Sequence, residues 1–228
     1  MSSVDHYNFV ANHPPLECQQ LRKSHNFVKQ FFVQRALRYL NKPMTQCSVI
    51  DLACGRGGDL GKVKDCARYV GVDTADQALA ELQRRAQEWN MKNVTVHHCD
   101  ATQIPAEANS AQLVLCNFAL HYFCDTAAHA AQLLDTVRRV LCPGGMWCGT
   151  YENVDAKEFG IEYHARIGDC VDATEWRVPW QLLLTMAYKR GLALTYTAPF
   201  QAIQQKSQSN IIGFIIQKSQ EIDTTCSA

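Results

Sequence analysis

The hydrophobic residues of this chain recur in two spacings that alternate along the sequence. Short apolar runs predict strands, and apolar residues three or four positions apart predict helices. A long amphipathic helix is expected first, over 16–40, and it ends before Lys42-Pro43. Strands are expected next at 48–53, 67–73, 94–100, 111–119 and 146–151, with helices from about 59, over 74–90 and over 126–141, and a turn at 143–145. This alternation is typical of a parallel sheet with helices on both faces.

The alternation ends after residue 151. Residues 152–175 are polar and acidic with little periodicity, so we expect an insertion or lid there. Residues 176–218 are expected to form a helix near 180–190 and two strands, in LALTYTA and NIIGFIIQ. The pattern predicts a single α/β domain over 1–228, with a doubly wound, mostly parallel seven-stranded sheet and a central core at 48–151.

The composition fits one hydrophobic core. The chain has 228 residues, of which 47% are hydrophobic and 19% charged, as is ordinary for a globular domain. The formal net charge of zero gives no global attraction to nucleic acid, so a basic site has to be local. No apolar run reaches the roughly 18 residues of a membrane-spanning helix, and MSSVDHYNF does not read as a signal peptide. We expect no membrane partner.

The eleven cysteines include no C-x-x-C pair. This spacing predicts neither a zinc ribbon nor a redox motif, and no metal site is expected. Several cysteines lie within apolar strands, where a thiol behaves as a small hydrophobic group. We therefore expect reduced cysteines in a nuclear or cytoplasmic protein, with a viral origin also compatible.

The stretch VIDLACGRGGDL contains a glycine loop between a strand and a helix. The apolar strand runs into Asp51, and Cys54-Gly55-Arg56-Gly57-Gly58 leads to a helix start near Asp59. In a doubly wound sheet the ligand lies at the carboxyl ends of the strands, and glycines let the backbone approach it. A dinucleotide fingerprint reads G-x-G-x-x-G, whereas Ala53 stands at its first glycine.

Polar residues close four successive predicted strands, at Asp51, Asp73, Asp100 and Asn117. The distance from the glycine loop to Asp73 suits an acid that binds ribose hydroxyls. The alternative interpretation is that these acids only cap the helices that follow them. A nucleoside ligand and a purely structural role both stay open on spacing alone.

The sequence DLACGRG resembles motif I of the S-adenosylmethionine-dependent methyltransferases. CNFALHY, at 116–122, resembles the motif CQFALHY of the mRNA cap guanine-N7 methyltransferases. Four further segments are similar to that family, namely HYN (6–8), LRKSHNFVK (21–29), CGRGGDL (54–60) and VDATEWRVPW (171–180). The resemblance covers about 6–218 and implies the Rossmann-like class I methyltransferase fold, with 48–151 as its cofactor-binding core.

The resemblance implies roles for the matching residues. S-adenosylmethionine would be bound by Lys29, Asp51, Ala53, Gly55, Asp73, Asp100, Asn117, Phe118 and Tyr122. A cap pocket would be lined by His25, Asn26, Arg56, Lys62, Arg85, His121 and Glu175. Lys29 matches the family lysine that reaches the carboxylate of the cofactor. Lys29, Lys62 and Arg85 could instead be solvated helix charges, and His121 a core histidine.

The implied reaction transfers a methyl group to N7 of the guanine cap of RNA, converting GpppN to m7GpppN. Guanine N7 has a free lone pair at neutral pH, so no side-chain acid or base is required and placement supplies the acceleration. We expect Glu175 to stabilise the positive charge of the methylated base, with His121 and Tyr122 in support. The basic residues of the cap set suit the triphosphate bridge.

Several positions depart from the family pattern. Ala53 stands for a glycine, Asn117 for a glutamine and His25 for an asparagine, and this last change puts one cap contact in question. A family tyrosine of the last strand corresponds to Ile212, although Phe214 could supply an aromatic ring from a shifted register.

Two other functions therefore stay open: methylation of another nucleotide or small molecule, and a catalytically weak scaffold subunit. The expected partners of a cap methyltransferase are the GpppN end of RNA and an RNA triphosphatase, a guanylyltransferase or an activating subunit.

Overall fold

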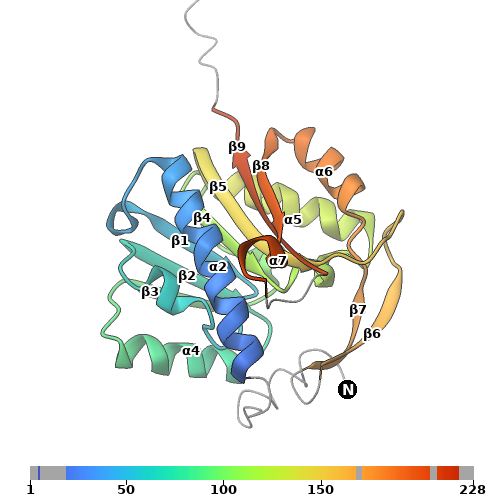
Figure 1. The fold of residues 1–228 in the computed structure, drawn as a ribbon. Coiled ribbons are helices and arrows are strands. Elements are labelled where there is room, and N and C mark those ends of the chain that lie inside the picture. The colour runs from blue at the N-terminus through green and yellow to red at the C-terminus, as the bar shows by residue number, and fades with distance from the viewer. Residues whose placement is uncertain (1–4, 6–18, 168–170, 206–209, 221–228) are drawn as a thin grey trace, which may run out of the picture.

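The computed structural model describes residues 5, 19–167, 171–205 and 210–220. Its centre is a seven-stranded sheet with the strand order β3-β2-β1-β4-β5-β9-β8 (Figure 1). The strands are β1 (Ser48–Leu52), β2 (Arg68–Asp73), β3 (Val94–His98), β4 (Ala111–Asn117), β5 (Leu141–Glu152), β8 (Leu192–Pro199) and β9 (Ile211–Lys218). The five strands from β1 to β5 pair in parallel, and β9 runs antiparallel to both β5 and β8. The predicted mostly parallel seven-stranded sheet is confirmed.

Helices cover both faces of this sheet (Figure 1). They are α2 (Gln19–Leu40), α3 (Leu60–Val63), α4 (Asp76–Glu88), α5 (Ala127–Val140), α6 (Trp180–Tyr188) and α7 (Phe200–Ile203), with short 3-10 turns η1 (Met44–Gln46), η2 (Ala101–Gln103) and η3 (Leu120–Phe123). One core cluster joins the sheet to α5 and α6, and a second joins it to α2, α3 and α4. This arrangement is the doubly wound architecture that the alternating pattern predicts.

The apolar stretches form buried strands because both faces of the sheet are covered. Every residue of β4 except Gln112 and Asn117 is buried, and so is every residue of β1 except Ser48. Strands buried on both sides read as continuous apolar runs rather than as alternating ones. Asn117 is therefore the point where β4 leaves the core.

The strand β5 begins earlier than the sequence predicts. Ala111 pairs with Leu141 but Leu113 pairs with Met146, so the residues between Leu141 and Met146 bulge out of register. Gly144 has φ +76° there, and a Cβ on Gly145 would lie 2.8 Å from the carbonyl oxygen of Cys142. The turn expected at 143–145 is therefore a glycine-dependent bulge inside β5.

The segment expected to be aperiodic forms a hairpin. β6 (Glu162–Ile167) pairs antiparallel with β7 (Val171–Trp176) outside the main sheet. Ala165, Ala173 and Glu175 are buried, whereas Glu162, His164 and Thr174 are exposed. The period-two pattern is hidden in the sequence because its buried positions hold small or charged residues instead of large apolar ones.

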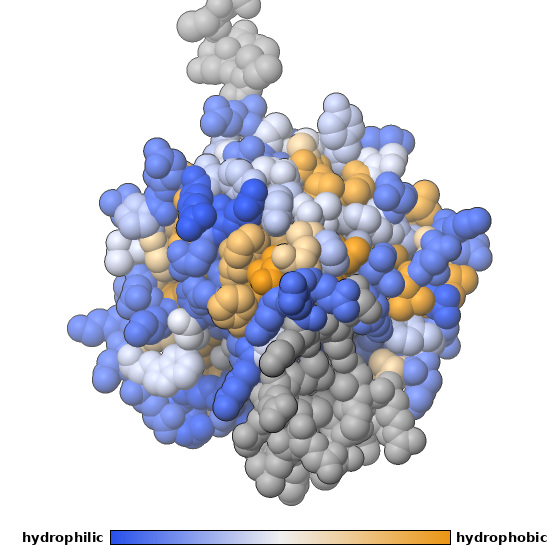
Figure 2. Space-filling model, in the orientation of Figure 1, coloured by the Kyte–Doolittle hydropathy of each residue, from blue (hydrophilic) through white to orange (hydrophobic). Residues whose placement is uncertain are grey.

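The surface is mixed in character. Figure 2 shows one face that is mostly hydrophilic and carries smaller hydrophobic areas, one of them over α6. None of the helices in the described part of the chain has the length and apolar character needed to cross a bilayer.

The described cysteines are free thiols: Cys47, Cys54, Cys66, Cys99, Cys116, Cys124, Cys142 and Cys148. Burial raises the pKa of Cys66 to about 11 and that of Cys124 to about 12. Cys116 in β4 and Cys148 in β5 are buried, and their thiols pack in the core as small hydrophobic groups, as the sequence predicts.

Candidate functional site

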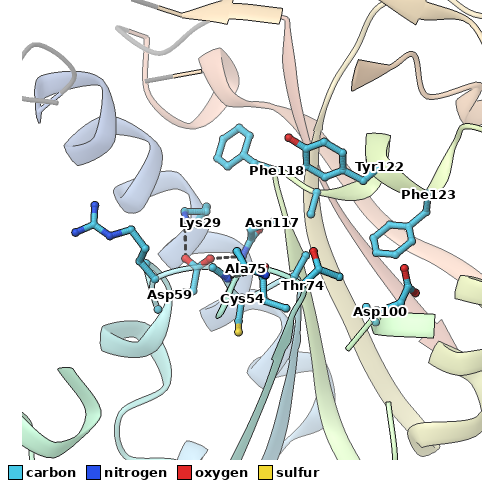
Figure 3. Close-up of a pocket in the computed structure, with 18 of the residues that line it drawn as sticks. Lys29, Cys54, Asp59, Thr74, Ala75, Asp100, Asn117, Phe118, Tyr122 and Phe123 are labelled. Carbon is cyan, nitrogen blue, oxygen red and sulfur yellow. Dashed lines mark hydrogen bonds and ion pairs between the residues drawn. The ribbon is translucent and has the colours of Figure 1, made fainter. Parts of the chain in front are cut away.

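A cavity of about 770 Å3 lies at the carboxyl ends of β1, β2 and β4. The strand order reverses between β1 and β4, which is where doubly wound sheets bind their ligands. Many residues proposed from the sequence line it: His25, Asn26, Lys29, Ala53, Gly55, Arg56, Asp73, Arg85, Asp100, Asn117, Phe118 and Tyr122. Segments far apart in the sequence therefore meet around one space (Figure 3).

The glycine loop after β1 depends on left-handed backbone conformations. Gly55 has φ +50° and Gly57 has φ +72°. A Cβ on Gly57 would lie 2.6 Å from Leu60 Cδ1, so a side chain there would have to displace that leucine as well as adopt a left-handed backbone. A Cβ on Gly55 would meet nothing within 4 Å, so open space lies beside that residue at the cavity wall. Ala53 also has a left-handed backbone, with φ +54°. This conformation is strained for alanine because the Cβ comes close to the following carbonyl oxygen.

Asp73 ties this loop to the end of β2. One of its carboxylate oxygens accepts a hydrogen bond from the backbone N–H of Gly55 at 2.7 Å, and the other accepts one from Ala75 at 2.9 Å. Burial raises the pKa of Asp73 despite these hydrogen bonds. Each oxygen has a second lone pair, so the carboxylate has capacity for a ligand that donates hydroxyl groups.

Asp100 both caps a turn and lines the cavity. It accepts a hydrogen bond from Thr102 N at 2.7 Å, so the capping alternative left open by the sequence holds for this acid. Its second oxygen lies 3.7 Å from Nε2 of His129, whose Nδ1 lies 2.7 Å from Asp125. These side chains form one polar corner of the cavity, beside Phe123 (Figure 3).

Asp59 holds together a cluster that includes three predicted site residues. Its carboxylate lies 2.8 Å from the Nζ atoms of both Lys29 and Lys62 and accepts a hydrogen bond from Asn117 Nδ2 at 3.1 Å (Figure 3). Burial alone would raise the pKa of Asp59, but the two ammonium groups lower it. Lys29 is buried, so it is not a solvated helix charge.

Aromatic rings form the wall above this cluster. The rings of His25 and Phe118 stack with centroids 5.0 Å apart, and Lys29 Nζ lies 5.6 Å from the Phe118 centroid. Phe118 has φ +54°, a strained conformation for a bulky residue, which the hydrogen bond from its N–H to the Thr150 carbonyl helps to hold. Strain of this kind is concentrated at ligand sites.

His25 offers an unused hydrogen-bonding atom to this wall. Its Nε2 is buried and has no hydrogen-bond partner among the residues that the structure describes. Burial and then the charge of Lys29 lower the pKa of His25 to about 4. The ring is therefore neutral near pH 7, with one nitrogen able to accept and the other able to donate.

An arginine cluster lies at another part of the cavity. Arg85 donates a hydrogen bond to Glu81 at 2.7 Å, and Arg56 lies 3.7 Å from the same carboxylate oxygen. Arg84 also pairs with Glu81. Burial and then the charge of Arg85 lower the pKa of Arg56. Such a cluster suits an anion with several oxygens.

Asp51 and Lys62 are not among the cavity-lining residues. Asp51 is 2% exposed and accepts a hydrogen bond from Tyr69 at 2.9 Å, so it lies beneath the cavity instead of contacting its contents. Lys62 is held by Asp59 and by Asn26 Oδ1 at 2.8 Å. The sequence placed both residues in the site because their motif positions match, but their polar groups bond to partners inside the protein.

His121 and Glu175 also lie outside the cavity lining, behind Tyr122. His121 Nε2 is 3.3 Å from Glu175 Oε1, and the Tyr122 hydroxyl donates to that oxygen at 3.3 Å. The Tyr163 hydroxyl donates to Glu175 Oε2 at 2.7 Å. Burial would raise the pKa of Glu175, but His121 and the two hydroxyl groups lower it. The structure thus brings the predicted pair together without exposing it to the cavity.

The last strand supplies no aromatic ring to the cavity. Phe214 is fully buried and packs on Trp147 and Trp180, with centroids 5.0 and 5.1 Å away. The expectation that it replaces the family tyrosine is wrong because its side chain lies in the core. Ile212 is partly buried against the same core cluster. The HYN segment at 6–8 lies outside the residues that the structure describes.

Sequence reasoning did not identify several cavity residues: Arg22, Cys54, Asp59, Thr74, Ala75, Trp89, Cys99, Phe123, Asp125, His129 and Trp176. Asp59, Thr74 and Cys99 lie within two positions of glycine-loop or strand-end residues, and that adjacency was an available signal. His129 and Trp176 come from α5 and β7, which only folding brings to the site.

The fold matches solved structures of methyltransferases. Burkholderia thailandensis 1,6-didemethyltoxoflavin-N1-methyltransferase superposes with a TM-score of 0.65 and 16% identity, covering 95% of this chain and 88% of the other. A S-adenosylmethionine-dependent methyltransferase from Clostridium acetobutylicum also gives a TM-score of 0.65, with 13% identity, covering 83% and 90%. At these identities the likeness shows the fold alone.

Sequence comparison is more specific. Rice (Oryza sativa subsp. japonica) mRNA cap guanine-N(7) methyltransferase 1 is 29% identical over 86% of this chain and 66% of its own length, and the Arabidopsis thaliana protein of that name is 27% identical over 85% and 65%. The chain thus spans just under two thirds of these relatives. The family model of the mRNA (guanine-N(7))-methyltransferase domain matches residues 4–158. This chain, with its glycine loop and strand-end cavity, therefore belongs to the mRNA (guanine-N(7))-methyltransferase domain family.

Proposed function

We propose that this chain transfers a methyl group from S-adenosylmethionine to N7 of the guanine cap of RNA. The observation that carries this proposal is one cavity with two kinds of wall. Asp73, Asp100 and the glycine loop form a side suited to a nucleoside, while the aromatic wall and the arginine cluster suit a planar base linked to phosphates. Family membership and the names of the relatives support the same function.

The residues at the strand ends fit S-adenosylmethionine. The free lone pairs of Asp73 would accept hydrogen bonds from ribose hydroxyls, beside the open backbone of Gly55. The polar corner at Asp100 would face the adenine, and Lys29 with Asn117 would hold the amino-acid end. When bound, this cofactor supplies a methyl group on a sulfonium, which is electrophilic without assistance from a metal or a base.

The chain would act on the guanine mainly by positioning it. Phe118 and His25 offer stacked rings, and the unpartnered His25 Nε2 offers a hydrogen bond to the base. N7 attacks through its own lone pair, so orientation contributes most of the acceleration. Glu175 would act through Tyr122, since its carboxylate holds that hydroxyl and contributes negative charge near the methylated base.

The arginine cluster would bind the triphosphate bridge. Arg56 and Arg85 present guanidinium groups to the cavity around one glutamate. Capped RNA would be the main partner. The GpppN end would be supplied by an RNA triphosphatase and a guanylyltransferase. An activating subunit as a further partner, and a nuclear or cytoplasmic location, belong to the same proposal.

A second candidate is methylation of another nucleotide. It is favoured by the position of His121 and Glu175 behind Tyr122 and by the absence of an aromatic side chain at Ile212. A scaffold role without catalysis is disfavoured, because Asp73 and Lys29 line the cavity with their charged groups in place.

The test is a transfer assay with labelled S-adenosylmethionine on RNA ending in GpppA and in pppA. We expect label on the cap guanine N7 after digestion, and none on uncapped RNA. The matched variant Asp73→Ala should lose cofactor binding in calorimetry, since the loop loses its anchor and the ribose its acceptor. Cofactor binding with no transfer to either RNA would favour a different acceptor.

A further inference from the structure

Trp89 is a half-exposed aromatic residue at the cavity. It follows α4 directly, is 47% exposed and lines the cavity with Arg85, which lies one helical turn earlier. A Cβ built on Gly61 would lie 3.5 Å from the indole atoms Cη2 and Cζ3, so the ring rests against a residue that has no side chain. The ring is therefore supported at one edge while nearly half of the residue faces solvent.

Exposed aromatic residues are common, and a single one needs no function. Among the large hydrophobic residues that the structure describes as exposed, Phe27, Tyr39, Leu182, Tyr188 and Leu194 do not line the cavity, whereas Trp89 does. Its position next to a guanidinium cluster is a second, independent feature. Trp89 thus differs from the others in location and in electrostatic surroundings.

We propose that Trp89 is a stacking platform for the base of the nucleotide that follows the cap. This inference rests on the proposed function. A capped end consists of guanosine, three phosphates and a second nucleoside. With the guanine at Phe118 and His25 and the phosphates at Arg56 and Arg85, the second base would follow the phosphates, and Trp89 lines the same cavity one helical turn after Arg85.

The chemistry of Trp89 suits this occupant. An indole stacks on any nucleobase because every base has a π face, so the contact adds affinity with little sequence preference. Larger purine rings overlap more of the indole than pyrimidines do. Trp89 therefore favours the cap of an RNA chain over free GTP, which has the guanine and phosphates but no second base.

The experiment compares GpppA with GTP as methyl acceptors for the wild-type protein, Trp89→Ala and Trp89→Phe. We expect Trp89→Ala to raise KM for GpppA about tenfold with kcat and the KM for GTP nearly unchanged, and Trp89→Phe to keep most of the affinity. Tyr188→Ala, at a residue that is 75% exposed on α6, is the matched control and should alter neither constant. Melting temperatures show whether each variant folds.

Binding measured by quenching of tryptophan fluorescence gives a readout that does not depend on turnover. GpppA should quench the wild-type signal more than GTP does, and Trp89→Phe should remove that difference. Normal methylation of GpppA with equal KM in wild-type protein and Trp89→Ala would overturn the platform while leaving the proposed function intact. A wild-type protein that neither binds nor methylates GpppA would overturn both.

Discussion

Lys29 Nζ lies 2.8 Å from Asp59 Oδ1, and both side chains are 10% exposed. The family resemblance assigns Lys29 to the carboxylate of the cofactor, whereas the structure gives it a carboxylate from the protein itself. Lys62 shares the same partner at 2.8 Å. One negative charge therefore balances two positive ones, and the cluster keeps a net positive charge that a second carboxylate would neutralise.

Asp59→Asn is predicted to destabilise the protein by about 3 kcal/mol, because two largely buried ammonium groups lose their counter-charge. The cofactor should then raise the melting temperature of Asp59→Asn more than that of the wild-type protein, since its carboxylate would replace the lost charge. Urea denaturation measures the loss of stability, and thermal melts with and without S-adenosylmethionine measure the shift in melting temperature. The exposed Asp65→Asn is the control, and equal stability of the two variants would contradict the prediction.

Ala53→Gly is predicted to stabilise the protein by about 1 kcal/mol. Ala53 has φ +54°, where a Cβ is unfavourable and glycine is not. Ala75→Gly, at a residue with φ −98°, should instead lose stability through backbone entropy. In thermal denaturation, the melting temperature should rise for Ala53→Gly and fall for Ala75→Gly if the left-handed conformation is the cause. A lower melting temperature in both variants would contradict this explanation.

Stability is predicted to fall with rising pH because of Asp51. Burial and then the charge of Asp59 raise the pKa of Asp51 to about 7, whereas the pKa of an unfolded aspartate is about 4. Between these values the folded chain keeps a proton that the unfolded chain releases, so this contribution is complete below about pH 4 and is lost as pH rises towards 7.

Asp51→Asn lacks this titration, and its stability relative to wild type should increase across that window in urea denaturation. Tyr69→Phe removes the hydrogen bond that lowers the pKa of Asp51 and should extend the loss to higher pH. Parallel curves for wild type and Asp51→Asn would show that Asp51 does not titrate differently in the folded state.

Glu175→Ala is predicted to lower kcat for cap methylation about 100-fold with little change in cofactor affinity. The hydroxyl groups of Tyr122 and Tyr163 donate hydrogen bonds to the carboxylate of Glu175. The change therefore removes both the group that orients Tyr122 and the negative charge of the carboxylate. Glu175→Gln keeps an accepting oxygen and should recover part of the loss. Single-turnover rates and cofactor calorimetry separate the two effects. Wild-type rates in Glu175→Ala would remove this residue from the mechanism.

Sequence spacing was a good guide to the main sheet and a poor one to the hairpin. Strands such as β1 and β4 are buried on both sides, so their apolar runs are unambiguous. In β6 and β7 the buried positions hold Ala165, Ala173 and Glu175, which are small or charged and give a weak hydrophobic pattern. The strand-end residues Asp73 and Asn117 were predictable, because parallel strands bring their carboxyl ends to one edge.

The sequence by itself determined the order of the elements, the glycine loop and the family, since each depends on local spacing or on a contiguous motif. Only the tertiary structure decided which charges face the cavity. Asp51 and Lys62 match site motifs but are used internally, while Trp89 and His129 reach the cavity from positions that no motif marks. The physical reason is that a charge takes its partner from whatever surrounds it after burial, and those surroundings come from elements distant in sequence.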